Sequence, residues 1–283
     1  MCEFCTKHGE GKKWYLQARN YSLDLLNDVR RRQFLRDFFD PSHSLGSGEE
    51  DLARLARAPG FVQRAIKARA TRQMKRQHFG QVLPIEDVEE IFGFVNSITR
   101  LACICRHSSL GREVRYCYGV SLGPGGAGAD SIWHELGLDA SFLAGPDGSG
   151  LEQISKEEAL EAFAEHERDG LCHSVWTFVT PFIGGICNCD RADCLAMRAT
   201  IGHDVKVMFR AEYVAQVNPD LCKGCRACMR ACQFGAIGFS VAEKKAFVDP
   251  RACWGCGVCR RNCPQDAISL RPRQQVPAAA GLW

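Results

Sequence analysis

The first stretch of the chain with a clear hydrophobic period runs from Trp14 to Phe39. Its apolar residues recur three or four positions apart, which is the spacing of one buried face of an α-helix. Asp40 and Pro41 end the pattern, because proline cannot continue a helix. This stretch therefore predicts one long helix or two consecutive ones.

A Ser/Gly-rich link at 42–48 leads to a short helix expected at 49–58, and a basic segment follows Pro59. The basic segment lacks acidic residues and contains Arg64, Lys67, Arg69, Arg72, Lys75 and Arg76. We interpret it first as a solvated helix face and second as a docking surface for an acidic partner. Nucleic acid is the least favoured partner, because aromatic residues that would stack on bases are scarce there.

Between residues 81 and 205 the pattern alternates between a helical period and short apolar runs. Two helix starts stand out, since acidic residues follow Pro84 and Glu158 follows Ser155 at the spacing of a capping box. The expected elements are a helix from Pro84, a helix from Ser155 to Arg168, and strands at 98–104, 175–186 and 205–217. This mixture predicts an α/β domain.

The strands expected at 98–104 and 175–186 each run into a C-x-C pair followed by a third cysteine. The six residues are Cys103, Cys105, Cys117, Cys187, Cys189 and Cys194. Side chains two positions apart leave a strand on the same face, so two such strands lying side by side would bring four thiolates together. Four thiolates are enough for a third iron-sulfur cluster or a closed zinc site, and packed free thiols are the alternative.

The C-terminal part contains two copies of one cysteine motif, C-x2-C-x2-C-x3-C. The first copy is Cys222, Cys225, Cys228 and Cys232, and the second is Cys253, Cys256, Cys259 and Cys263. Bacterial ferredoxins use this run of thiolates to hold 4Fe-4S clusters. Gly224 and Gly255 fall at the same offset in both copies, where a missing Cβ lets the backbone curl close to a metal.

Residues 211–271 thus resemble a two-cluster ferredoxin domain, and the motif is complete in both copies. The resemblance implies a pseudo-twofold (βαβ)2 fold in which the fourth cysteine of each motif ligates the other cluster. The implied ligands are Cys222, Cys225, Cys228 and Cys263 for one cluster, and Cys253, Cys256, Cys259 and Cys232 for the other.

A wider stretch, from about residue 80 to 271, is similar to a known family. The similarity rests on Cys103-Ile104-Cys105-Arg106, the helix start near Ser155, and Gly185-Ile186-Cys187-Asn188-Cys189 ahead of the ferredoxin motifs. These features resemble cytoplasmic 4Fe-4S dicluster proteins of anaerobic bacteria and archaea that carry an extra cysteine-rich domain. The resemblance implies electron transfer and names no substrate.

The chain of 283 residues is long for a ferredoxin, which leaves room for further domains. We expect an α+β protein with a helical N-terminal region at 1–80, an α/β cysteine-rich domain at 81–205, a ferredoxin domain at 206–271 and a mobile tail at 272–283. The formal net charge of +3 is uneven, because residues 206–283 carry 12 Lys/Arg against 5 Asp/Glu. A basic C-terminal part fits docking of an acidic redox partner.

Seventeen cysteines without a recognisable signal peptide predict a reducing, cytoplasmic setting, and clusters of this kind suggest anaerobic metabolism. No apolar run approaches the roughly 18 residues of a membrane span, so none is expected. At the start of the chain, Cys2, Cys5 and His8 offer three metal ligands without an obvious fourth. Frayed free thiols are the alternative there.

The predicted function is an iron-sulfur electron-transfer protein or subunit that relays single electrons through two 4Fe-4S clusters to or from a partner oxidoreductase. No nucleophile and base fall in a recognisable motif, so no catalytic residue is assigned, and an electron carrier is favoured over a stand-alone catalyst. One alternative is an enzyme with a substrate-reactive third centre in the C-x-C domain. Another is a redox-sensing nucleic-acid-binding protein that uses the basic helix.

Overall fold

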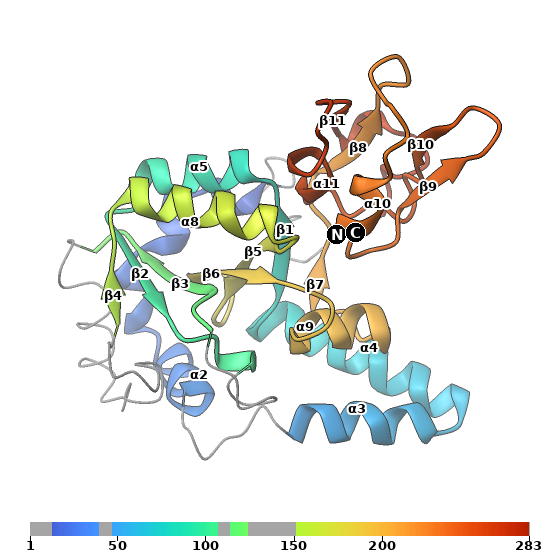
Figure 1. Cartoon of the computed structure of the whole chain (residues 1–283). Helices are drawn as coiled ribbons and strands as arrows, with labels where there is room; N and C mark the ends of the chain where they lie inside the picture. Colours follow the sequence, from blue (N-terminus) through green and yellow to red (C-terminus); the bar gives the residue numbers. More distant parts are fainter. Residues whose placement is uncertain (1–12, 40–46, 107–113, 124–150, 283) are drawn as a thin grey trace.

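The structure, a computed structural model, describes residues 13–39, 47–106, 114–123 and 151–282 (Figure 1). Cys2, Cys5, His8 and most of the Ser/Gly-rich link lie outside the described residues. The described chain mixes helices and strands in an α+β fold, with one seven-stranded sheet and a smaller ferredoxin-type domain. No described helix has the length and apolar character needed to cross a membrane.

The N-terminal segment is less helical than its apolar period predicts. It forms three 3-10 turns, η1 (Trp14–Leu16), η2 (Ala18–Tyr21) and η3 (Leu23–Asn27), and then helices α2 (Val29–Phe39), α3 (Ser47–Arg57) and α4 (Gly60–Gln77). Asn20 donates a hydrogen bond to the Trp14 carbonyl, and the Tyr21 hydroxyl donates one to the Tyr15 carbonyl. These side chains satisfy carbonyls that a continuous helix would pair with its own backbone, which explains the difference.

The large sheet has the strand order β4-β2-β3-β6-β5-β1-β7. The strands are β1 (Gly80–Leu83), β2 (Ser97–Leu101), β3 (Cys117–Ser121), β4 (Glu152–Gln153), β5 (Cys172–Thr177), β6 (Ile183–Cys189) and β7 (Met208–Phe209). All neighbours are antiparallel except β1 and β7. The strand expected at 175–186 is in fact the antiparallel pair β5 and β6, which turn around Pro181.

One face of the sheet is covered by helices α5 (Ile85–Phe94) and α8 (Lys156–Arg168), which lie side by side above it in Figure 1. Both begin at the expected places, and α8 carries a complete capping box between Ser155 and Glu158. The buried contacts come from Ile91, Phe92 and Phe163 on the helices and Ile98, Tyr118, Val120, Val175 and Ile186 on the strands. This face is therefore an ordinary apolar core.

The opposite face of the sheet carries the cysteines. Because side chains alternate along a strand, Cys117 and Cys187 point away from α5 and α8 and pack with α2, α3 and the short helix α9 (Leu195–Met197). A π-helical turn, η5 (Arg198–Gly202), continues α9. Both C-x-C segments thus belong to a second core on this face.

The ferredoxin-type domain contains two β-α-β units in sequence. They are β8 (Tyr213–Val217), α10 (Ala227–Ala231) and β9 (Ile237–Ser240), then β10 (Lys245–Val248), α11 (Val258–Arg261) and β11 (Ile268–Pro272). Strand β8 pairs with β11 and β9 with β10, so each pair joins the two repeats. The run expected as one strand at 205–217 is divided between β7 of the large sheet and β8 of this domain.

The segment after Pro272 is packed, in contrast to the expected mobile tail. It begins with a turn, η6 (Arg273–Gln275), and both Arg273 and Ala279 are fully buried. The Arg273 guanidinium donates hydrogen bonds to the carbonyls of Ala211, Tyr213 and Cys253 at 2.7, 2.8 and 3.0 Å. Arg273 therefore binds the C-terminal tail to the segment that enters β8 and to the loop at Cys253. The composition of the tail alone could not predict these contacts.

Replacing Arg273 by alanine is expected to lower the free energy of unfolding by about 2–4 kcal/mol, because three buried carbonyls lose their donor and a void remains. Thermal unfolding followed by circular dichroism under anaerobic conditions measures the change. The exposed Arg271 provides the control, and Arg271→Ala should stay within about 0.5 kcal/mol of the parent. Equal losses in the two variants would contradict the anchoring role of Arg273.

Candidate iron-sulfur and metal centres

The eight cysteines of the repeated motif gather at two small cavities. One cavity is lined by Cys222, Cys225, Cys228 and Cys263. The other is lined by Cys253, Cys256, Cys259 and Cys232. In both, the fourth cysteine of one motif lies beside the first three of the other, which is the placement that crossed ligation requires.

Each cysteine loop curls through left-handed backbone. Gly224 has φ of 69° and Gly255 has φ of 75°, and a Cβ at these positions would lie 2.4 Å from the Lys244 carbonyl oxygen and 2.2 Å from that of Tyr213. Only glycine fits such close approaches between backbones. In both repeats the glycine of the cysteine loop therefore packs directly against the carbonyl of another backbone segment.

Backbone N–H groups point at the sulfur atoms in the same manner in both repeats. The N–H of Ala236 donates to Cys232 Sγ at 3.3 Å, and that of Ala267 donates to Cys263 Sγ at 3.4 Å. Ala215 donates to Cys253 Sγ at 3.4 Å. Such bonds stabilise thiolate charge and help to set the reduction potential of a bound cluster.

The second cavity is more sheltered from solvent than the first. Cys225 of the first cavity is exposed. Trp254 and Phe234 both line the second cavity, and their rings stack with centroids 4.7 Å apart. Burial raises the pKa of the Cys253 and Cys256 thiols, so the positive charge of a bound metal would be needed to keep them ionised. Trp254 and Phe234 thus form an aromatic part of the wall of this cavity.

The comparisons with known proteins agree with this geometry. Residues 211–275 match the family model of the 4Fe-4S dicluster domain. The dicluster domain supports iron-sulfur electron transfer as the chemistry of this part of the chain. The match covers the C-terminal part of the chain.

No curated protein sequence matches the chain. Among solved structures, one similar chain is adenosine 5'-phosphosulfate reductase in complex with substrate, with 31% identity over 24% of this chain and a TM-score of 0.21. The match spans half of the length of that chain. The likeness is local.

The six cysteines of the two C-x-C segments also come together. Cys117 and Cys187 are register partners on β3 and β6, and their Sγ atoms lie 3.3 Å apart. The Sγ atoms of Cys189 and Cys194 lie 3.4 Å apart. Cys103 contacts Cys117 and Cys105 contacts Cys194 through their thiols. We call these six residues the six-cysteine site.

The way in which the six cysteines meet differs from the expectation. The two C-x-C pairs do not lie on neighbouring strands, because β2 ends at Leu101 and Cys105 lies in a helical turn beyond it. Cys117, on the strand between, pairs with Cys187 instead. Among the described residues, no three or more potential ligands converge in the geometry of a preformed single-ion site. The donor set suits thiophilic metals, and binding would require the thiols to adjust.

Arg106 places a buried positive charge beside the six-cysteine site. Its Nη1 lies 3.5 Å from Cys103 Sγ, and its guanidinium forms an ion pair with Asp190. A hydrogen bond with Cys117 and the charge of Arg106 lower the pKa of Cys103 to about 7. Hydrogen bonds with Cys105 and Cys189 hold the pKa of Cys194 well below its usual value. Hydrogen bonds to these two thiols and burial raise the pKa of Cys105, Cys117 and Cys189 well above the usual value, so only part of the site favours thiolates. Sequence reasoning assigned no role to Arg106.

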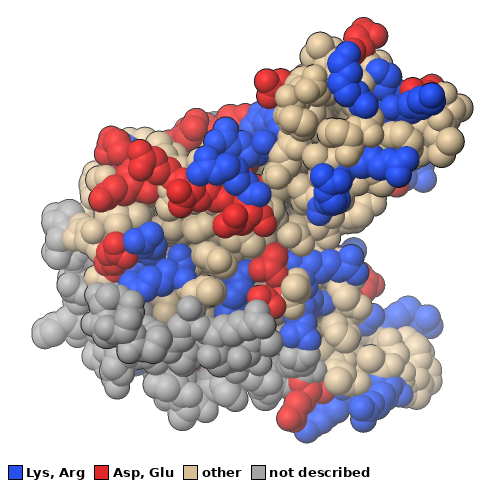
Figure 2. All heavy atoms as spheres, viewed as in Figure 1, with Lys and Arg blue, Asp and Glu red and all other residues tan. Residues whose placement is uncertain are grey.

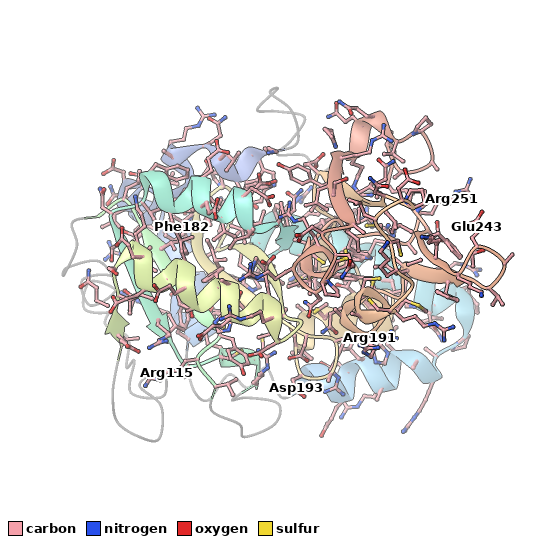
Figure 3. The ribbon with its side chains drawn as sticks, turned by 45° about the horizontal axis from the view of Figure 1, so that its top comes forward. Arg115, Phe182, Arg191, Asp193, Glu243 and Arg251 are labelled. Atoms are coloured by element: carbon pink, nitrogen blue, oxygen red, sulfur yellow. The ribbon has the colours of Figure 1, made fainter. Side chains whose placement is uncertain are left out.

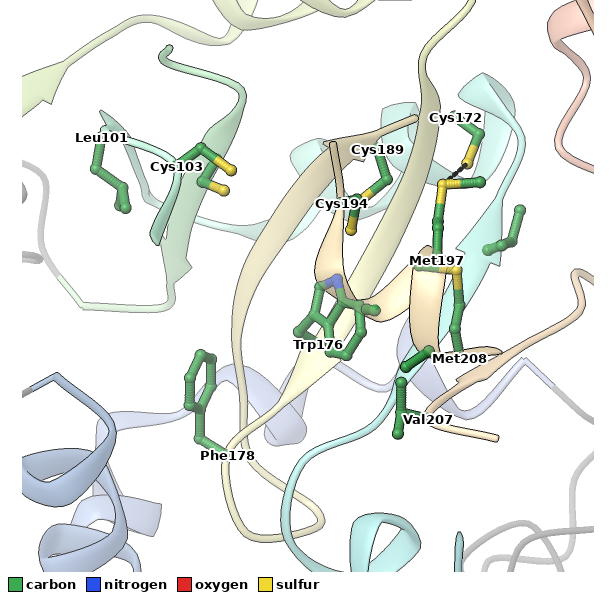
Figure 4. Packing of buried hydrophobic residues seen from close by; sticks show 14 of the residues in the cluster. Leu101, Cys103, Cys172, Trp176, Phe178, Cys189, Cys194, Met197, Val207 and Met208 are labelled. Atoms are coloured by element: carbon green, nitrogen blue, oxygen red, sulfur yellow. Dashed lines mark hydrogen bonds between the residues drawn. The ribbon is translucent and has the colours of Figure 1, made fainter. Parts of the chain in front are cut away.

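A seventh cysteine, Cys172, lies between the two cysteine-rich parts. It is fully buried, is the register partner of Cys189, and has its Sγ 4.0 Å from Met197 Sδ (Figure 4). It interacts electrostatically with Cys194 and with Cys256 of the dicluster domain. Sequence reasoning did not select Cys172, because it stands outside both repeated patterns.

Side-chain contacts fix the dicluster domain against the sheet domain. Gln233 donates a hydrogen bond to the Gly170 carbonyl at 2.8 Å, and Asn262 donates one to the Glu167 carbonyl at 2.9 Å. In Figure 3, Arg191 lies at the border of the two domains, where its backbone N–H donates to the Gln233 side chain. Cys256, Phe234 and Trp254 pack against the core that contains the six-cysteine site. The sheltered cavity of the dicluster domain is thus the one nearer to that site.

Double variants test the crossed arrangement of the dicluster ligands. Cys225→Ser with Cys263→Ser removes two expected ligands of one cluster and should reduce its iron content from about eight to about four atoms per chain. Cys225→Ser with Cys232→Ser, which changes one motif only, removes one ligand from each cluster and should disturb both. Iron and acid-labile sulfide are counted in protein purified without oxygen. If instead Cys225→Ser/Cys232→Ser loses one cluster only and Cys225→Ser/Cys263→Ser disturbs both, ligation is not crossed.

Proposed function

We propose that the chain is an iron-sulfur electron-transfer protein, or the electron-transferring subunit of a larger oxidoreductase. The dicluster domain holds two 4Fe-4S clusters on the two groups of four cysteines and passes single electrons between them. The observation that carries this proposal is the gathering of all eight motif cysteines as two groups of four, within a segment that matches the 4Fe-4S dicluster domain. The protein makes no bonds in this role, and thiolate ligation and N–H···S bonds tune the potentials.

The six-cysteine site is proposed to hold a further metal centre, either a third iron-sulfur cluster or zinc. Its thiolate-only donors, its burial and the neighbouring Arg106 support this assignment. All described cysteines are free thiols, which fits a reducing compartment such as the cytoplasm.

The redox partner is proposed to be a protein with an acidic docking surface. Basic side chains gather over α3, α4 and the dicluster domain, while acidic ones gather over α5 and α8 (Figure 2). Helix α4 has no buried residue among its 18, and Arg64, Arg69 and Arg72 on it are exposed to solvent. Opposite charges on two surfaces speed encounter and orient it.

A second candidate function is an enzyme in which the six-cysteine site reacts with a substrate. It is favoured by a cavity whose wall includes Cys105, Cys117 and Cys187. In a pure electron relay the metal would be closed on all sides, whereas a reactive centre needs space beside it.

Protein purified without oxygen should contain about eight irons and eight acid-labile sulfides in its dicluster domain, and dithionite should reduce it in two one-electron steps. A potentiometric titration followed by electron paramagnetic resonance should show two neighbouring spins that interact, because the two cavities share one small domain. Protein that contains neither iron nor labile sulfide under these conditions would end the proposal.

The six-cysteine site should bind metal beyond that of the dicluster domain. Iron, sulfide and zinc are measured in the parent and in the Cys187→Ser/Cys189→Ser variant, which should lose the additional metal and keep about eight irons. Cys172→Ser is the matched control, because Cys172 is buried nearby without belonging to the site. A parent protein with two clusters and no zinc would remove the third centre from the proposal.

A further inference from the structure

A cavity of about 490 Å³ lies on the cysteine-bearing face of the large sheet. Its floor comes from β2, β3, β5 and β6, and its sides come from α2, α3, α4 and the segment from α9 to Val207. This volume is typical of a pocket for a small organic molecule. Cys105, Cys117 and Cys187 line it, so it opens directly on the six-cysteine site.

Aromatic rings form one end of this cavity. The His78 ring lies 4.6 Å from that of Phe38, 5.0 Å from that of Trp176 and 5.0 Å from that of Phe178, centroid to centroid. His78 donates from Nδ1 to the Thr177 carbonyl, and burial lowers its pKa to about 4, so the imidazole is neutral at pH 7. These rings pack on one another and present an aromatic surface against which a flat ring can stack.

The polar groups of the wall are few and mostly uncharged. Ser97 and Thr99 add hydroxyl groups from β2, and Asp51 is the one ionised side chain among the described lining residues. No described lysine or arginine lines the cavity. A phosphate or carboxylate would have to give up its hydration without a cation to replace it, so the wall selects an uncharged molecule.

Glycine leaves the floor of the cavity open. Gly119 lies in the middle of β3, where glycine weakens a strand. It has no left-handed φ, and a Cβ there would meet its nearest neighbour, Leu101 Cδ2, at an ordinary 3.6 Å. Neither backbone conformation nor crowding therefore requires glycine at this position. Its effect is to keep free the space that a side chain would fill.

The cavity and the dicluster domain lie on opposite sides of the six-cysteine site. Cys105, Cys117 and Cys187 face the cavity, whereas Cys189 and Cys194 neighbour Cys172, which in turn interacts with Cys256. Figure 4 shows Cys189 and Cys194 near Trp176, which is part of the cavity wall. A molecule in the cavity would thus lie at one end of a row of cysteine sulfur atoms whose other end is Cys256 of the dicluster domain.

We propose that this cavity binds an uncharged aromatic redox molecule of the quinone class, with its ring against the aromatic wall formed by Phe38, His78, Trp176 and Phe178. The inference rests on the proposed electron-transfer function. A bound quinone takes up two electrons, one from each reduced cluster of the dicluster domain, and two protons from water, and leaves as the hydroquinone while both clusters return to their oxidised state. Elsewhere on the wall, the hydroxyls of Ser97 and Thr99 are donors from which a quinone oxygen can accept, and the unprotonated Nε2 of His78 can accept from a hydroquinone hydroxyl.

Binding to the oxidised holoprotein tests the proposal without depending on electron transfer. The probe is 2,3-dimethyl-1,4-naphthoquinone, whose substituted ring does not add to thiols, and equilibrium dialysis measures its Kd. Gly119→Leu fills the floor of the cavity and should weaken binding by about tenfold or more. Gly93→Leu makes the same change on the exposed side of α5, away from the cavity, and should bind as the parent does.

A charged analogue gives a second measurement on the unaltered protein. The 6-sulfonate of the same quinone should bind about tenfold or more weakly, because no cation receives it. Binding that does not saturate, equal binding by folded Gly119→Leu, or equal binding of the sulfonate would overturn the proposal. Should Gly119→Leu fail to fold, the sulfonate comparison decides. Iron and sulfide counts on the same samples distinguish failure of the electron-transfer function from failure of quinone binding. Absent clusters refute the proposed function. Intact clusters without quinone binding refute this inference alone.

Discussion

The contact between the C-terminal end of α8 and the dicluster domain is the interaction on which the arrangement of the molecule depends. The last carbonyls of a helix have no partner inside it. Here Asn262 and Gln233 of the dicluster domain donate to the carbonyls of Glu167 and Gly170 at that end. Val258, fully buried at the start of α11, fills the adjoining apolar core. The helix end thereby places the sheltered cysteine cavity beside Cys172.

Because side chains alternate along each strand, the apolar core under α5 and α8 and the cysteines lie on opposite faces of the large sheet. On β3, Tyr118 and Val120 face α5 and α8, while Cys117 and Gly119 face the cavity. The same division on β6 puts Ile186 in the apolar core and Cys187 beside Cys117. One face can therefore be close-packed for stability, and the other can keep thiols and open space.

Local spacing in the sequence predicted the cysteines of both sites, the helix starts at Pro84 and Ser155, and an α+β fold. It could not predict how the strands pair, because register depends on contacts between distant segments. For that reason no pairing of Cys117 with Cys187 was expected, although the two are register partners on β3 and β6. Arg273 was assigned to a mobile tail for the same reason, since its three carbonyl acceptors lie far away in sequence.

Charge balance limits what the six-cysteine site can be. Six ionised thiols in an apolar core would be too costly to bury, because each unpaired buried charge costs several kcal/mol. Arg106 is the adjacent cation, and Asp190 already neutralises it. The thiols must therefore either keep most of their protons or share the positive charge of a metal. The hydrogen bonds that lower the pKa of Cys103 and Cys194 raise those of Cys105, Cys117 and Cys189, so without a metal the thiols would share their protons and only part of the site would be ionised.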